Sequence, residues 1–89
     1  MLTVKKGFIL RKLDTEHIVV AIGEASKEFN GMIRLNGTGA MYWKELEKGT
    51  TKEELVAKTM EQYKGVDEKT VSCDVEEFLA SISAALEQA

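Results

Sequence analysis

The chain has 89 residues, a net charge of −3 and ordinary shares of apolar and charged side chains, which predicts one small globular domain over 1–89. A chain of this length buries roughly 60–65% of the surface that it exposes when unfolded, which leaves little volume for an enclosed active site. Its longest apolar run, from Ile18 to Ile22, is far shorter than the roughly 20 residues that cross a bilayer, so a membrane protein is not expected.

The start of the chain has two lysines but no long apolar segment after them, so it lacks the pattern of a secretory signal peptide. Cys73 is the only cysteine, and one thiol cannot form an internal disulfide. Both features predict a cytoplasmic protein.

The first part of the chain predicts a β-hairpin. The segment 8–13 is apolar with a basic interruption, and the segment 17–22 is rich in β-branched residues. Between them, residues 14–16 form a polar break that is typical of a hairpin turn. An antiparallel strand is therefore expected on each side of this turn.

A third strand is expected at Met32–Leu35, after a polar loop over 23–31. The strand is short and contains Arg34, which suits the edge of a sheet better than its centre. Three N-terminal antiparallel strands would then occupy about 7–35.

Helical patterns begin at Asn36, whose side chain is a good N-cap, and the first helix is expected to end at Gly49. Thr50 or Thr51 would cap a second helix that ends at Gly65, because each threonine has a glutamate three positions later. Apolar side chains recur at helical spacing in both segments.

A third helix is expected to begin at Asp67, so that helices occupy about 36–88. Its apolar stripe has a helical period and consists of Val71, Val75, Phe78, Leu79, Ile82 and Leu86. We expect one core that contains Trp43, Leu46, Leu55, Met60, Val75, Phe78 and Leu79.

Three antiparallel strands followed by three α-helices, with short connections, predict an α+β domain. Strands packed beside three helices are typical of a winged helix-turn-helix-like fold in which the wing comes first. The fold class expected from the sequence is therefore α+β and winged-helix-like.

The set of chemically reactive side chains is small. His17 is the only histidine and is far in sequence from Cys73, so neither a metal site nor a catalytic pair is expected. We expect His17 to be an exposed structural residue, and Cys73 to be a small helical residue that is buried or nearly so.

Two further patterns do not support catalysis. Gly37 and Gly39 are not a phosphate-binding loop, because no Lys-Ser/Thr pair follows and Tyr42 breaks the G-x-G-x-x-G pattern. Glutamate doublets occur at 53–54 and 76–77. Adjacent side chains on a helix point about 100° apart, so the two members of a doublet do not form an acid–base pair. We therefore expect no enzymatic activity, no catalytic residue, no metal and no cofactor.

Charge is distributed unevenly along the chain. Residues 67–89 carry one lysine and six carboxylates, a net charge of −5, whereas residues 1–35 are slightly basic. A nucleic-acid-binding helix needs a basic surface. The third predicted helix would repel phosphates, so a nucleic-acid partner is not expected.

The third strand is the candidate binding element. An open strand edge beside a helix can accept a peptide as an added strand, through main-chain hydrogen bonds. Alternatively, the charge of Arg34 protects an edge that binds nothing. The pattern alone favours the two interpretations equally.

Two motifs carry a resemblance to a known family. Residues 32–46, Met-Ile-Arg-Leu-Asn-Gly-Thr-Gly-Ala-Met-Tyr-Trp-Lys-Glu-Leu, continue through Gly49-Thr50 to Leu55 and resemble the pyrroloquinoline quinone (PQQ) biosynthesis protein D (PqqD-like) family. The later pattern Val71-x-x-Asp74-Val75-x-x-Phe78-Leu79 is similar as well. The resemblance covers nearly the whole chain and depends on the order and spacing of the motifs together.

The resemblance implies a recognition element for ribosomally synthesised, post-translationally modified peptides (RiPPs). Such a domain binds the leader peptide of a precursor as an added strand and presents it to a modifying enzyme, often a radical S-adenosylmethionine maturase. The product is PQQ or another modified peptide. The implied peptide-binding residues are Met32, Ile33, Arg34, Leu35, Val71, Asp74, Val75 and Phe78.

Alternatives of other classes stay open. One is a winged-helix DNA-binding regulator, which a basic recognition helix would distinguish, and another is a small scaffolding subunit. A domain of this kind also allows a homodimer, including one that swaps elements. Titration with short peptides encoded nearby would separate leader binding from both alternatives.

Overall fold

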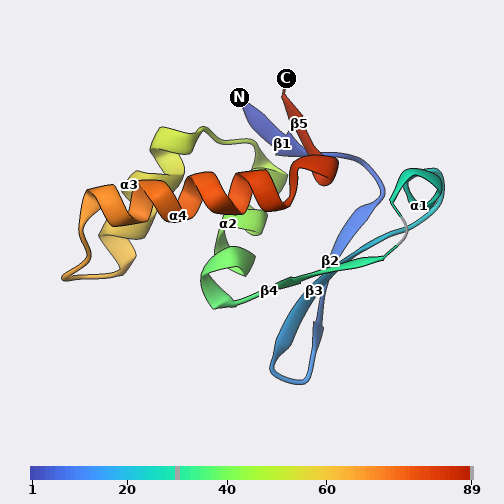
Figure 1. Cartoon of the computed structure of the whole chain (residues 1–89), viewed down its shortest axis with the longest axis horizontal. Helices are drawn as coiled ribbons and strands as arrows, with labels where there is room; N and C mark the ends of the chain where they lie inside the picture. Colours follow the sequence, from blue (N-terminus) through green and yellow to red (C-terminus); the bar gives the residue numbers. More distant parts are fainter. Residues whose placement is uncertain (30, 89) are drawn as a thin grey trace.

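A three-stranded antiparallel sheet forms the first part of the fold (Figure 1). The computed structural model describes residues 1–29 and 31–88. The strands are β2 (Phe8–Leu13), β3 (Glu16–Ala21) and β4 (Met32–Leu35), in the order β2-β3-β4. A two-residue turn joins β2 to β3, and its Asp14 has a φ of 57°, which aspartate tolerates better than most residues. The predicted sheet, with β4 at one edge, is confirmed.

Residues 1–29 and 31–88 form four α-helices where the sequence predicted three. The additional one, α1 (Ala25–Glu28), is a single turn inside the expected loop 23–31. It begins where the Ser26 hydroxyl donates a hydrogen bond to the Gly23 carbonyl, at 2.6 Å. Just after it, the ring of Phe29 packs on Phe8 with centroids 5.7 Å apart. This turn therefore depends on a contact with β2 that the polar composition of the segment did not indicate.

The other helices are α2 (Gly37–Lys48), α3 (Lys52–Gln62) and α4 (Glu68–Ser81). The predicted N-cap Asn36 accepts a hydrogen bond from the Gly39 amide at 2.7 Å, and Thr51, not Thr50, caps α3. Asn36 is the single residue between β4 and α2, so the cap also fixes the direction in which α2 leaves the sheet. No helix in the described ranges is long and apolar enough to cross a bilayer.

The end of the chain corrects the predicted third helix, which was expected to continue to Leu86. Helix α4 ends at Ser81, a 3₁₀ turn spans Ser83–Ala85, and β5 (Leu86–Gln88) pairs antiparallel with β1 (Leu2–Val4). Ile82 and Ala85 are nevertheless fully buried. The predicted apolar stripe thus gave the burial of Ile82 correctly, although Ile82 follows the last residue of the helix. Ala85 was not part of that stripe, and Leu86 is only half-buried.

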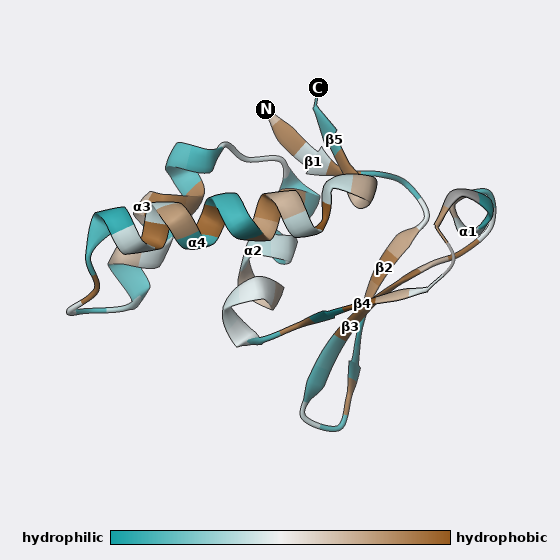
Figure 2. Ribbon diagram, in the orientation of Figure 1, coloured by the Kyte–Doolittle hydropathy of each residue, from teal (hydrophilic) through white to brown (hydrophobic). Residues whose placement is uncertain are grey.

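The hydrophobic core lies between the sheet and the helices. It consists of Phe8, Val19, Leu35, Tyr42, Trp43, Leu46, Leu55, Val56, Val71, Val75, Ile82 and Ala85. Of the predicted core residues, Met60, Phe78 and Leu79 are only partly buried but pack against this cluster. Figure 2 shows that the tip of the β2–β3 ribbon, which projects from the rest of the molecule, is mostly hydrophilic.

A pair of leucine truncations tests this core. Leu46 is fully buried, whereas Leu13 near the hairpin tip is 58% exposed. Leu46→Ala is expected to lower the free energy of unfolding by about 2–5 kcal/mol, because it leaves a cavity. The matched Leu13→Ala change should stay within about 0.5 kcal/mol. Urea denaturation measures both, and equal effects would contradict the described packing.

Candidate functional site

A groove lies between the end of β4 and the C-terminal half of α4, and the start of α2 forms its third wall. Its volume is about 320 Å³. The strand contributes its last two residues, and α4 contributes the face that points toward the sheet. The groove is lined by Arg34, Leu35, Asn36, Thr38, Gly39, Tyr42, Asp74, Glu77, Phe78 and Ser81.

Strand β4 presents an open edge at this groove. It pairs with β3 on one side, with Ile33 opposite Val19 and Leu35 opposite His17. No other strand in the described part of the chain pairs with its outer side. Because successive residues of a strand direct their amide and carbonyl groups to opposite sides, alternate residues of β4 offer unpaired hydrogen-bonding groups to an incoming strand.

Two aromatic residues shape the groove. The rings of Tyr42 and Phe78 meet edge to face, with centroids 5.1 Å apart, which is a favourable arrangement of aromatic quadrupoles. Tyr42 is buried, whereas Phe78 is half-buried. The Tyr42 hydroxyl is buried and has no hydrogen-bond partner among the described residues. Such a group costs free energy, and a buried hydroxyl next to a groove is a candidate contact for a ligand.

Gly39 brings the three walls together. A Cβ atom at this position would lie 3.3 Å from the Leu35 Cβ, the Phe78 Cε1 and the Asn36 Oδ1. These distances are tighter than most carbon contacts, so the absence of a side chain lets the first turn of α2 approach both β4 and α4. Glycine is otherwise unfavourable inside a helix, which indicates that its role here is this close approach.

The groove carries opposite charges on its two sides. Arg34 lies on the strand, and Asp74 and Glu77 lie on α4. The Arg34 guanidinium is 3.8 Å from the carboxylate of Glu16 in β3. Both side chains are well exposed, so this ion pair contributes little to stability. Neither Asp74 nor Glu77 forms an ion pair with a described residue. The charges of the groove are therefore available to a ligand.

The structure brings together half of the predicted site residues. Arg34, Leu35, Asp74 and Phe78 line the groove. Met32 and Ile33 precede it on the same strand. Val71 and Val75, however, are 4% and 0% exposed, so they lie in the core and support α4 from behind.

Several residues that line the groove were not among the predicted site residues: Asn36, Thr38, Gly39, Tyr42, Glu77 and Ser81. The spacing of three between Gly39 and Tyr42 is the signal in the sequence that both residues lie on one side of the helix. Cys73 corrects another expectation, because it is exposed rather than buried. It lies on α4 between Val71 and Val75, and a residue midway between two buried positions of a helix points outward.

His17 is half-buried, not fully exposed as expected. It lines a different hollow on the other side of α2. In the described ranges, no three side chains of His, Cys, Asp or Glu lie close enough together to hold a metal ion. The chemistry that the groove offers is therefore hydrogen bonding, aromatic contact and charge.

A solved structure with a similar fold is that of TbiB1 in complex with the TbiA(beta) leader peptide. It matches with a TM-score of 0.77 and 24% sequence identity, over 98% of this chain and 96% of that chain. No curated protein shows significant sequence similarity to the chain. The structural match establishes a shared fold over almost the whole length of both proteins.

Sequence comparison with protein families gives a direct assignment. The family of coenzyme PQQ synthesis protein D (PqqD) matches residues 16–85. The matched region contains β3 and β4, all four helices and every residue that lines the groove. The resemblance seen in the sequence motifs is thus confirmed, and the chain belongs to the coenzyme PQQ synthesis protein D family.

Proposed function

We propose that this domain binds the leader segment of a ribosomally synthesised precursor peptide and presents it to a modifying enzyme. The observation that carries the proposal is the open edge of β4 beside the groove under α4. Membership of the PqqD family supports it, as does a shared fold with a protein that was solved with a leader peptide bound.

In the proposed complex, the leader extends the sheet as a fourth strand next to β4. Main-chain hydrogen bonds to Met32–Leu35 supply affinity that depends little on sequence. Alternate side chains of the leader point into the groove, so an apolar leader residue packs against Phe78. Val71 and Val75 hold α4 in place from the core and are not contacted directly.

Charge is proposed to set the register of the leader. Arg34 favours an acidic leader residue near the strand, whereas Asp74 and Glu77 favour a basic residue near α4. Exposed charged contacts are individually weak. Most of the affinity is therefore assigned to the backbone and to the apolar anchor, and the charges mainly exclude wrong alignments.

The domain itself is proposed to be non-catalytic, because the groove holds no nucleophilic side chain paired with a general base. The whole of 1–89 would act as one cytoplasmic unit with a winged-helix-like arrangement. Its enzyme would be a radical S-adenosylmethionine maturase or another modifying enzyme, in a PQQ or related peptide pathway. A DNA-binding role is disfavoured, since residues 67–89 carry a net charge of −5.

The direct test is an NMR titration of the ¹⁵N-labelled domain with the leader of the precursor peptide encoded beside this gene. The largest amide shifts are expected in 32–35 and 70–79, because these segments flank the groove. A scrambled leader of the same composition serves as control. Shifts confined to 50–64, or equal shifts with the scrambled peptide, would contradict the proposal.

Two neighbouring proline substitutions test strand addition. Successive amides of a strand face opposite sides, so one of the amides of Ile33 and Arg34 faces β3 and the other faces the free edge. Of Ile33→Pro and Arg34→Pro, one should lower the melting temperature by removing a sheet hydrogen bond. The other should preserve folding yet weaken leader binding by about threefold to tenfold, the value of one hydrogen bond.

Calorimetry with the leader, together with thermal melts, separates the two variants. Each is the control of the other, because the same residue type is introduced one position apart. The proline at the position whose amide faces the free edge is the decisive variant. If it keeps both the melting temperature and the full leader affinity, pairing along β4 is ruled out.

The buried hydroxyl of Tyr42 gives a second, independent test. We expect the leader to pack against the half-buried Phe78 ring and to provide the missing hydrogen-bond partner of the Tyr42 hydroxyl. Tyr42→Phe should then raise the free energy of unfolding by about 1 kcal/mol, because it removes an unpaired buried group. It should also weaken leader binding by about threefold to tenfold. Unchanged affinity in calorimetry would show that the hydroxyl does not contact the leader.

A further inference from the structure

We propose that the side of α2 turned away from the groove carries a second binding surface, which takes an acidic segment of a partner protein. We call this surface the back hollow and define it by His17, Met41, Lys44, Glu45, Lys48 and Lys58. We assign the acidic segment to the modifying enzyme, and that assignment of the partner rests on the proposed function.

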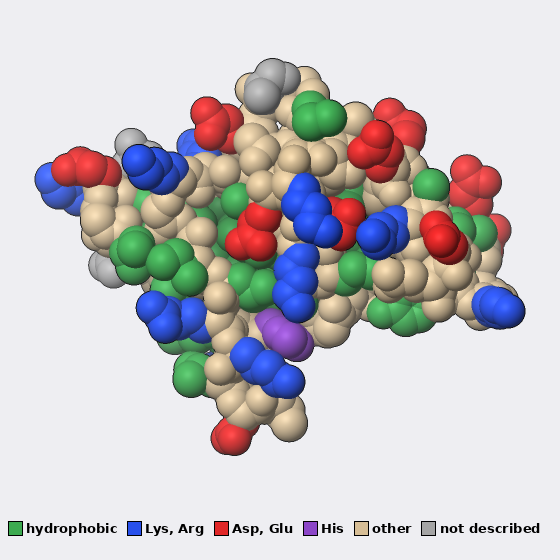
Figure 3. Space-filling view, turned by 180° about the vertical axis from the view of Figure 1, so that it is seen from behind, with side chains coloured by type: hydrophobic (Ala, Val, Ile, Leu, Met, Phe, Trp, Pro, Cys, Tyr) green, Lys and Arg blue, Asp and Glu red, His purple; other side chains and the backbone are tan. Residues whose placement is uncertain are grey.

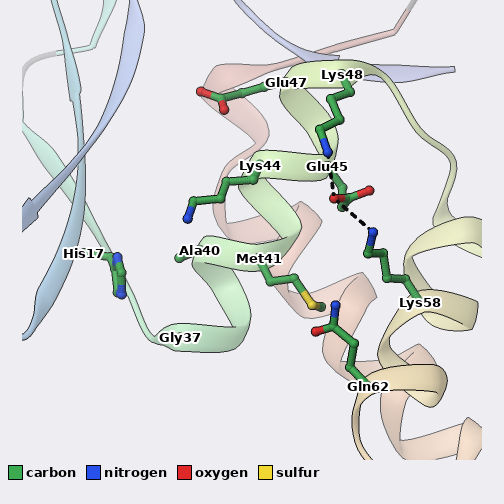
Figure 4. A pocket seen from close by; sticks show the side chains of 10 residues that line it. All are labelled: His17, Gly37, Ala40, Met41, Lys44, Glu45, Glu47, Lys48, Lys58 and Gln62. Atoms are coloured by element: carbon green, nitrogen blue, oxygen red, sulfur yellow. Dashed lines mark ion pairs between the residues drawn. The ribbon is translucent and has the colours of Figure 1, made fainter.

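The back hollow is larger than the leader groove, with a volume of about 630 Å³. Figure 4 shows its floor, where Ala40 and Met41 lie between the β3 residue His17 and the α3 residues Lys58 and Gln62. Its sides thus come from three separate elements. An apolar floor with polar sides suits a segment in which apolar and charged residues are interspersed.

Lysines dominate the charge of the hollow. The carboxylate of Glu45 is 3.5 Å from the ammonium groups of both Lys48 and Lys58, so one negative charge is shared by two positive charges. Lys44 extends toward His17 (Figure 4) and forms no ion pair with a described residue. Even with Glu47 included, the lysines outnumber the carboxylates. The space-filling view of this face shows the same gathering of blue side chains around the histidine (Figure 3).

The two surfaces lie on opposite sides of one helix. Tyr42 lines the leader groove and Lys44 lines the back hollow; two residues along an α-helix correspond to a rotation of about 200°. Both surfaces can therefore be occupied at the same time. A domain that presents one polypeptide to another needs this arrangement.

The charges of the two surfaces also determine which of them an acidic segment binds. The groove has two carboxylates, Asp74 and Glu77, against Arg34, so it disfavours an acidic segment. The back hollow has the opposite balance and attracts the same segment, although the whole chain carries a net charge of −3. Complementary charge of this kind selects the binding side and increases the rate of association more than the final affinity. The interaction is therefore expected to weaken steeply with salt.

The test uses a short acetylated and amidated peptide of alternating glutamate and leucine, titrated into the ¹⁵N-labelled full chain. The expected shifts fall on His17, on 37–48 and on the α3 residues Lys58 and Gln62, and they disappear on raising the salt to about 0.5 M. The same peptide with lysine in place of glutamate should leave these amides unshifted. No shift with the acidic peptide, or shifts in 32–35 and 70–79 instead, would overturn the proposal.

Charge reversal then identifies the lysines. The double variant Lys44→Glu with Lys48→Glu should weaken the acidic peptide at least about fivefold, because two attractive contacts become repulsive. The double variant Lys64→Glu with Lys69→Glu makes the same change in net charge at exposed positions outside the hollow, and it should leave the affinity nearly unchanged. An equal loss of affinity for the acidic peptide in both double variants would mean that binding depends only on the net charge of the chain. That result would also overturn the proposal.

Leader titration of the same variants separates this inference from the proposed function. The reversed lysines do not line the groove, so the leader affinity should be unchanged in both double variants. A leader that fails to bind the unaltered chain would count against the proposed function. The acidic-peptide result would still decide whether the back hollow is a binding surface.

Discussion

The close approach of the first turn of α2 to β4 and α4 is the constraint on which the groove depends. Gly39 allows it by lacking a side chain, and Asn36 fixes it by capping the helix one residue after the strand ends. A strand and a helix joined by one residue cannot vary their relative direction much. The position of Tyr42 beneath Phe78 follows from this junction, and so does the placement of the lysines on the reverse side of the same helix.

An open strand edge is usually a risk for aggregation, and natural proteins protect such edges with charge or short length. Strand β4 has both protections, since it has four residues and an exposed Arg34. The two readings that the sequence left open, a protected edge and a binding edge, are therefore compatible. The short length of β4 limits its pairing with arbitrary strands. A peptide that also places a side chain against Phe78 gains affinity from the adjoining groove.

Local signals in the sequence were sufficient for the elements that depend on local physics. The β-branched run of β3, the Asn36 cap and the glycine at 49 predicted their elements nearly to the residue. Strands β1 and β5 could not be predicted in this way, because each is three residues long and its partners lie far away in the sequence. They pair with each other, and Leu2 of β1 also forms a backbone bridge with Thr50. The groove was predicted in part, since an apolar helical stripe does not distinguish Val75 in the core from Phe78 at the surface.

The pairing of Leu2 with Gln88 has a consequence for synthesis on the ribosome. The β2–β3 hairpin and the contact between α3 and α4 join segments that are close in sequence, so they can form while the chain is still emerging. The β1–β5 ribbon cannot, because its second strand is made roughly 80 residues after its first, and closing so long a loop is entropically costly. Leu2 also exchanges two backbone hydrogen bonds with Thr50, and this contact can form earlier, once α2 has emerged. The β1–β5 ribbon itself forms only after the strand Leu86–Gln88 has left the exit tunnel.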